Sequence, residues 1–210
     1  MNAIDSVTLE VADPQAAARF YSDAFRLDPA RVRVRAGEAP TTGFRGFTLS
    51  LVVSQPGNVD ALVTAALDAG ATSLKPAAKS LWGYGGVVQA PDGTIWQIAT
   101  SAKKDTGPVT RDVDEIVLLL GVEDVRASKR FYVEHGLTVA KSFGGKYVEF
   151  ATGPDTVKLS LYKRRGLAKV AGVPAEGTGS HRIALCGADR PFSDPDGFVW
   201  ESTAPSAVTG

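Results

Sequence analysis

Cysteine and histidine are almost absent from this sequence. Its 210 residues include one cysteine, Cys186, and two histidines. One cysteine excludes an intrachain disulfide, and so few Cys and His side chains exclude a zinc module built from them. The sequence also lacks the apolar run of about 20 residues that a membrane-spanning helix needs, and its first residues lack the pattern of a signal peptide. We therefore expect a cytoplasmic protein.

An excess of charge of either sign is absent as well. Lys+Arg and Asp+Glu both number 23, so the formal net charge is zero. Nucleic acids and anionic membranes require a basic face, and the balanced composition gives no reason to expect either partner. With 44% hydrophobic and 22% charged residues, the chain has the composition of an ordinary globular protein.

What the sequence does contain is an internal repeat, which is typical of a duplicated domain. Residues 11–21 read VADPQAAARFY and residues 122–132 read VEDVRASKRFY, at an offset of 111. Further on, PDGTIW at 91–96 returns as PDGFVW at 195–200, at an offset of 104. Two matches in the same order predict a first domain over 1–102, a polar linker over 103–112 and a second, trimmed domain over 113–205.

Hydrophobic periodicity gives each copy a similar start. Alternation predicts a strand over 5–11, and a helix follows it, with Asp13 as N-cap. Asn58 is expected to cap a second helix, and the Pro91-Asp92-Gly93 turn joins the two closing strands of the copy. In the second copy Asp124 is the expected cap. Too few residues remain near the end for another crossover helix, and a short helix near 164–170 is expected to cover that face instead.

These motifs resemble those of the glyoxalase/bleomycin-resistance/extradiol-dioxygenase proteins, the vicinal-oxygen-chelate superfamily. The resemblance rests on Asp before a helix with Arg-Phe-Tyr, and on Asp194-Pro195-Asp196-Gly197-Phe198-Val199-Trp200-Glu201. It implies an α+β fold of duplicated βαβββ-type domains, whose curved mixed sheets form clefts. Single-domain relatives dimerise to complete a cleft, so a two-copy chain is expected as a monomer or a homodimer.

The resemblance also implies positions for divalent-metal ligands, namely His residues on opening strands and carboxylates on closing strands. Strand parity places those positions at Ser6, Thr48 and Gln97 in the first copy, and at Val117, Arg182 and Glu201 in the second. This donor set is poor in imidazole and carboxylate, so no cofactor is expected. Arg182 and Glu201 are expected to pair across the cleft. The alternative is an atypical site for Zn, Ni, Mn or Fe formed by Glu115, His181 and Glu201.

A second group of candidate residues lies before a strand of the first copy. Lys79, Trp82 and Tyr84 stand in a glycine-rich segment, and aromatic rings beside polar groups commonly line small-molecule pockets. We expect Trp82 and Tyr84 to stack on a small, for instance aromatic, ligand and Lys79 to contact an anionic group. Alternatively, the glycines shape a turn and the rings pack on the sheet.

Three functional classes follow from these alternatives. The first is a metal-independent protein that binds or sequesters a small molecule, as in the bleomycin-resistance branch, with Ser6, Thr48, Lys79, Trp82, Tyr84, Gln97 and Arg182 as ligand-binding residues. The second is an enzyme of the glyoxalase, lyase or dioxygenase type, either with the atypical metal site or with Glu201 as a general base. The third is a structural module with a plugged cleft. The sequence favours the first class.

Overall fold

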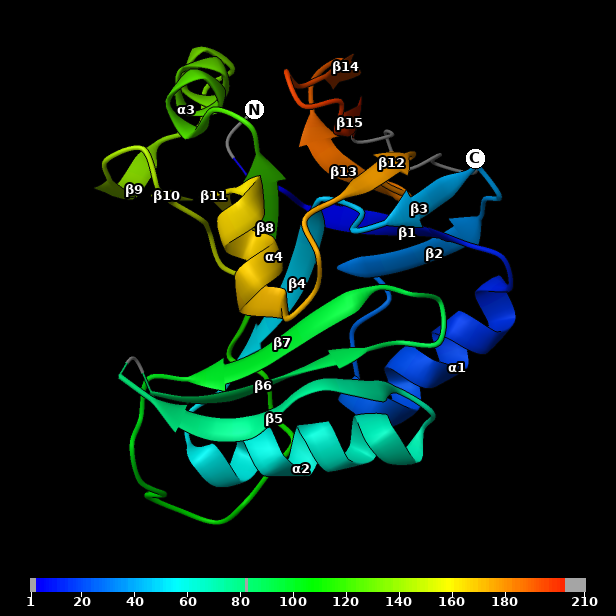
Figure 1. The fold of residues 1–210 in the computed structure, drawn as a ribbon, viewed down its shortest axis with the longest axis vertical. Helices are drawn as coiled ribbons and strands as arrows, with labels where there is room; N and C mark the ends of the chain where they lie inside the picture. Colours follow the sequence, from blue (N-terminus) through cyan, green and yellow to red (C-terminus); the bar gives the residue numbers. More distant parts are fainter. Residues whose placement is uncertain (1–2, 82, 203–210) are drawn as a thin grey trace, which may run out of the picture.

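The computed structural model describes residues 3–81 and 83–202, and it arranges them in two large sheets, a short ribbon and helices on their faces (Figure 1). The helices are α1 (Pro14–Phe25), α2 (Pro56–Asp68), α3 (Val125–Glu134) and α4 (Arg164–Ala171). In spatial order, the eight-stranded sheet consists of β5 (Thr72–Ser80), β6 (Gly83–Gln89), β7 (Ile95–Thr100), β4 (Phe47–Val52), β8 (Glu115–Val122), β11 (Lys158–Lys163), β10 (Tyr147–Phe150) and β9 (Val139–Phe143).

The five-stranded sheet consists, again in spatial order, of β14 (Phe192–Ser193), β15 (Val199–Ser202), β13 (Ile183–Ala188), β1 (Ser6–Val11) and β2 (Val32–Ala36). The ribbon pairs β3 (Thr41–Gly43) with β12 (Gly177–Gly179). This mixture of helices and mixed sheets confirms the α+β fold predicted from the repeats. As expected, no helix lies between β13 and β15.

Each sheet combines strands from both copies of the repeat. At the centre of the larger sheet, β4 of the first copy pairs antiparallel with β8 of the second, from Phe47 opposite Leu120 to Val52 opposite Glu115. In the smaller sheet, β1 of the first copy pairs antiparallel with β13 of the second. Neither sheet is therefore formed by one of the predicted domains, 1–102 or 113–205, alone. The division of the chain into these two domains stays a prediction from the sequence repeat.

The two repeated helix starts form as predicted. The Asp13 carboxylate accepts a hydrogen bond from the Ala16 amide at 2.9 Å, with Pro14 in the first turn. Asp124 accepts from the amides of Arg126 and Ala127. Each cap satisfies amides that the helix itself leaves unpaired.

The start of α2 differs from the prediction. The helix begins at Pro56 with Gln55 as its N-cap residue, so Asn58 lies inside the helix and is not its cap. Both side chains bind the interdomain segment instead. Gln55 accepts hydrogen bonds from the amides of Thr106 and Gly107, and Asn58 accepts one from the amide of Thr110. The segment between the copies is thus fastened to the first turn of α2.

The two faces of the eight-stranded sheet are covered by different helices. Adjacent residues on a strand point to opposite faces. Val88, Trp96 and Ile98 join the main core with α1 and α2, whereas Val87 and Ile95 pack against Leu167, Ala168 and Ala171 of α4. The short helix expected near 164–170 is present, but it covers the face of the eight-stranded sheet opposite α2 (Figure 1) and not the face of the missing crossover between β13 and β15. In the described ranges no helix is long and apolar enough to cross a membrane.

Candidate functional site

The positions predicted to hold metal ligands fall on two different sheets. Gln97, Ser50 and Val117 are neighbours across β7, β4 and β8, and the Gln97 amide donates to the Thr48 hydroxyl at 2.8 Å. Ser6, Cys186 and Glu201 are neighbours across β1, β13 and β15. The structure thus groups these positions by sheet and not by copy, because the central strand pairs form between copies.

On the eight-stranded sheet, the centre of the face that carries the predicted positions is filled by the protein itself. On the face that carries Thr48, Gln97 and Val117, α4 inserts Leu167, Ala168 and Ala171, all at most 1% exposed. The ammonium of Lys75 on β5 donates to the carbonyl oxygens of Lys169 and Val170, which satisfies acceptors at the end of α4. The apolar middle of this face is thus not available to a ligand while α4 is docked.

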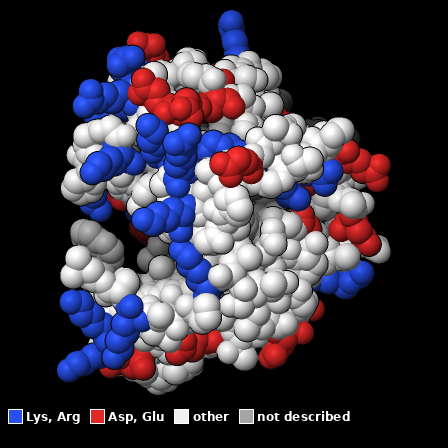
Figure 2. Space-filling model, in the orientation of Figure 1, with Lys and Arg blue, Asp and Glu red and all other residues white. Residues whose placement is uncertain are grey.

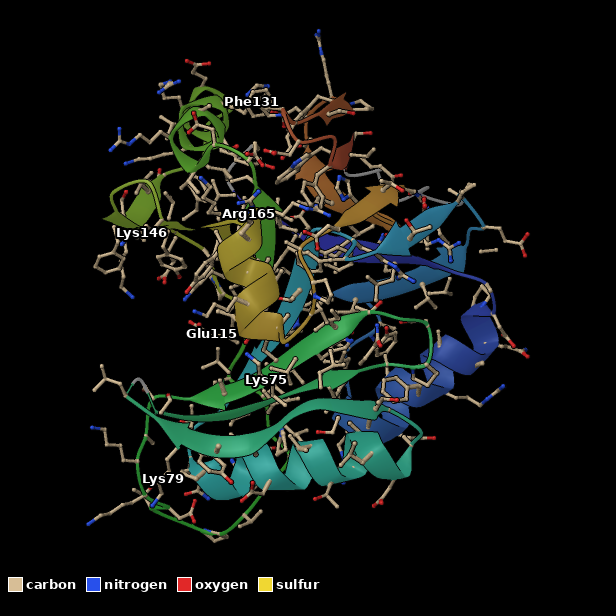
Figure 3. The ribbon with its side chains drawn as sticks, in the orientation of Figure 1. Lys75, Lys79, Glu115, Phe131, Lys146 and Arg165 are labelled. Atoms are coloured by element: carbon tan, nitrogen blue, oxygen red, sulfur yellow. The ribbon has the colours of Figure 1, made fainter. Side chains whose placement is uncertain are left out.

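A hollow of about 390 Å³ remains beside α4, and it brings together some of the predicted ligand-binding residues. Gln97, Lys79 and Tyr84 all border it. The Tyr84 hydroxyl, however, donates to the carboxylate of Asp60 on α2 at 2.8 Å, which commits the polar end of the ring to that helix and raises the tyrosine pKa. Lys79 is exposed (Figure 3). Trp82 lies outside the described residues.

The smaller sheet carries a charged cluster on the face that bears Ser6. Arg35 of β2 donates to the carboxylate of Glu10 on β1 at 2.6 Å and to that of Glu201 on β15 at 2.7 Å. The side chains are 41%, 23% and 35% exposed for Arg35, Glu10 and Glu201. The hydrogen bond that Arg35 donates to Glu10 is the main reason that the pKa of Arg35 is raised above its ordinary value. Two carboxylates thus hold one guanidinium between strands of different copies.

Two residues of this cluster, Glu10 and Arg35, line a pocket of about 460 Å³, and Glu201 is not among the lining residues. Glu10, Arg35 and Asp196 are its charged lining residues, and Ile183, Ala184 and Val199 supply apolar surface. Deeper on the same face, the Thr8 hydroxyl lies 3.8 Å from the Cys186 sulfur, and the Ser6 hydroxyl is buried without a hydrogen-bond partner among the described residues. Concave shape, a few fixed polar groups and apolar walls are the usual composition of a small-molecule site.

Arg182 does not pair with Glu201 as predicted. Its guanidinium donates to the carbonyl oxygen of Ala39 at 2.9 Å, and its backbone has a φ of 52°. This left-handed residue lies before β13 begins at Ile183, so the strand alternation used for the prediction does not extend to it. Arg35, from the other copy, takes the expected place beside Glu201.

His181 occupies a position between backbone groups. Its Nδ1 lies 2.5 Å from the carbonyl oxygen of Arg45, its Nε2 lies 3.0 Å from that of Asp196, and its ring stacks on Phe198 with centroids 3.9 Å apart. Both ring nitrogens are therefore engaged. His181 therefore joins the backbone at Arg45 to the backbone at Asp196.

The three residues of the predicted atypical metal site, Glu115, His181 and Glu201, do not lie together in the structure. Glu115 belongs to the larger sheet, where the Lys158 ammonium binds both its carboxylate oxygens at 2.9 and 2.8 Å, whereas Glu201 belongs to the smaller one (Figure 3). Among residues 3–81 and 83–202 no three His, Cys, Asp or Glu side chains form a group that could hold a metal ion. The donor set at the predicted positions likewise does not fit the family's metal, since it offers one carboxylate and no imidazole.

Sequence reasoning missed Arg35 and assigned no role to Glu10. Glu10 was detectable, because it shares strand parity with Ser6 and Thr8 on β1. Arg35 stands in the alternating segment VRVRA, and only the parallel pairing of β2 with β1 sets it opposite Glu10. Its second partner, Glu201, is 166 residues away in the sequence.

No protein-family model matches this sequence, and no curated protein is detectably similar to it. Solved structures do match. Glyoxalase I from Zea mays superposes with a TM-score of 0.61 at 13% identity, over 94% of this chain and 90% of that one. A candidate dioxygenase from Bacillus subtilis superposes with a TM-score of 0.60 at 15% identity, over 97% of this chain and 86% of that one. Identities this low concern the fold alone, and on that level this chain has the fold of the vicinal-oxygen-chelate proteins.

Proposed function

We propose that this chain is a metal-independent small-molecule-binding protein whose ligand occupies the pocket over the five-stranded sheet. The observation that carries the proposal is the Arg35 guanidinium held between Glu10 and Glu201 at the wall of that pocket. Ion pairs exposed to this degree contribute little to stability, about 0–1 kcal/mol each. A cluster that spans three strands and places Glu10 and Arg35 on the wall of a pocket is therefore better explained by binding than by folding.

The ligand chemistry follows from the groups that the cluster leaves open. Arg35 binds the Oε1 atom of each carboxylate, so the Oε2 atoms of Glu10 and Glu201 remain as acceptors in the described part of the chain. Ile183 and Val199 offer apolar contact nearby. We expect a compact ligand with N–H or O–H donors at one end and an apolar or aromatic body.

A thermal-shift screen of such compounds tests the proposal. A ligand at 100 times its Kd stabilises the folded state by about 2.7 kcal/mol, which for a chain of this size raises Tm by about 5–10 °C. We expect hits on the wild type that are lost in Glu201→Gln and in Arg35→Met. The matched control is Lys141→Met, which removes the surface ion pair with Glu149 elsewhere and keeps the hits.

Two outcomes would count against the proposal. Hits that bind Glu201→Gln and Arg35→Met as tightly as the wild type would place the ligand elsewhere. Stoichiometric binding of Zn, Ni, Mn or Fe(II) that is lost in Glu201→Gln would instead favour a metal-dependent enzyme of the glyoxalase or lyase type. Metal content and thermal shift on metal addition are measured on the same preparations.

A further inference from the structure

Although the formal net charge of the chain is zero, basic side chains gather on one face of the molecule. Figure 2 shows Lys and Arg side chains in a band that runs down the front of the molecule over α4, with acidic groups mostly beyond its ends. Arg165, Lys75 and Lys79 follow one another down this side in Figure 3, and Lys146 lies beside the upper end. Lys163 and Lys169 flank Arg165 in the sequence and are exposed. We call these six residues the basic face.

The charges of the basic face are largely uncompensated. Lys79, Lys146, Lys163, Arg165 and Lys169 are exposed, and none of them forms an ion pair with a carboxylate of the described residues. The Lys75 ammonium binds carbonyl oxygens of α4 and keeps its full charge. A cluster of free cations on one face attracts a polyanion by its summed field.

Two hairpins bring large apolar side chains to the edge of this face. Leu81, at the turn between β5 and β6, is 81% exposed, and Phe143, at the end of β9, is 65% exposed. They are the two most exposed large hydrophobic residues in the described chain. The end of β5, the start of β6 and the β9–β10 hairpin lie on the same side of the molecule, at the left in Figure 1. Lys79 lies two residues before Leu81, and Lys146 lies three residues after Phe143.

From this arrangement we propose that the chain binds the surface of anionic lipid bilayers peripherally, with Leu81 and Phe143 entering the headgroup boundary and the basic face lying against the anionic headgroups. The pattern of exposed apolar residues among lysines favours lipid over nucleic acid, because an aliphatic side chain such as Leu81 gains by leaving water for the acyl boundary and has no ring to stack on a base. This contact uses a different sheet from the proposed ligand pocket and does not depend on it.

Cosedimentation with vesicles tests the proposal on the full chain. We expect binding to phosphatidylcholine vesicles that contain about 30% phosphatidylserine, no binding to phosphatidylcholine alone, and release at high salt, since each basic residue near an anionic surface contributes about fivefold to partitioning. The double variant Arg165→Glu/Lys169→Glu should lose at least about 25-fold in partition coefficient. The matched control Arg19→Glu/Arg190→Glu reverses two exposed arginines outside the basic face and should bind as the wild type does.

The apolar contribution needs its own pair of variants. Leu81→Ser/Phe143→Ser should weaken binding to anionic vesicles about tenfold or more, while Leu67→Ser/Val133→Ser, at two other exposed apolar positions, leaves it unchanged. Unaltered melting temperatures establish that each variant is folded. Equal binding to neutral and anionic vesicles, equal losses in the control pairs, or no binding to anionic vesicles would each overturn the proposal. Binding of a DNA duplex in the absence of vesicle binding would overturn it in favour of nucleic acid.

Discussion

At the scale of single residues, each copy has a buried tyrosine at the equivalent position, and the two hydroxyls donate to carboxylates at different positions of the repeat. Tyr132 donates to Asp194 at 2.6 Å, whereas Tyr21, its counterpart, donates to Asp92. The offset of the late motif sets Ala90 where Asp194 stands, so the first copy uses the aspartate of the turn itself. Burial, and then the neighbouring carboxylate, raises the pKa of both tyrosines well above the ordinary value.

Replacing these tyrosines by phenylalanine should destabilise the protein unequally. Asp194 is 5% exposed, so Tyr132→Phe leaves a buried carboxylate short of a donor and should lower the free energy of unfolding by about 1.5–3 kcal/mol. Tyr21→Phe should cost less, because Asp92 is half-buried and reaches water. Urea denaturation of both variants beside the wild type measures the difference. Equal losses would show that burial of the acceptor does not govern the effect.

The loss in Tyr132→Phe should also depend on pH. Burial raises the pKa of Asp194, and the hydrogen bond from Tyr132 opposes that rise. Without the hydroxyl, the pKa of Asp194 in the folded variant rises further. The extra destabilisation of the variant is therefore complete above that pKa. It fades as pH falls and vanishes once Asp194 is protonated in both proteins. Denaturation curves in steps from neutral to acid pH should therefore converge. A constant gap would contradict this account.

At the scale of elements, α4 lies in the face where a ligand cleft was expected. The sequence indicated the helix but not its place. The helix was expected to cover the face left bare by the missing crossover between β13 and β15, whereas α4 packs on the eight-stranded sheet, on the face opposite α2. The sequence also did not indicate that β5 and β9 are strands. Both are edge strands of the larger sheet, and their polar composition, with Pro76 inside β5, is what an edge tolerates and a central strand does not.

Shortening Leu167, the central buried side chain of α4, should weaken the packing of α4 on the eight-stranded sheet. Leu167 is fully buried against the sheet, and Leu→Ala at such a site costs about 2–5 kcal/mol. We expect Leu167→Ala to lower Tm and to increase the binding of a hydrophobic dye, with Val170→Ala, 40% exposed in the wild type, as the control. If only dye binding rises, with Tm unchanged, the helix docks too weakly to block the face.

At the scale of the whole molecule, the repeat predicted the fold but not which strands pair with each other in each sheet. Hydrophobic alternation defines which residues form β1 and β4. Nothing local states that their partners are β13 and β8, because antiparallel pairing over such separations depends on the packing of the complete chain. This is also why the sequence grouped Ser6, Thr48 and Gln97 by copy, and why Arg35 was not linked to Glu201.

Separated copies should therefore not fold on their own. A fragment of residues 1–102 would expose the edge of β4 that β8 covers and the edge of β1 that β13 covers, and unpaired edges of this kind favour aggregation. We expect this fragment and the fragment 113–205 to lack dispersed NMR spectra alone and to recover them when mixed. A well-dispersed spectrum of either fragment alone would support independent domains.

The pairing of β1 with β13 also has a consequence for synthesis on the ribosome. Thr8 and Cys186, which contact each other across these strands, are 178 residues apart, so β1 leaves the exit tunnel long before β13. At about 5–20 residues per second the intervening synthesis takes about 10–35 s. During that time Val7 and Leu9 lack their β13 partners Leu185 and Ile183, and the nascent chain depends on chaperones or on temporary contacts with α1.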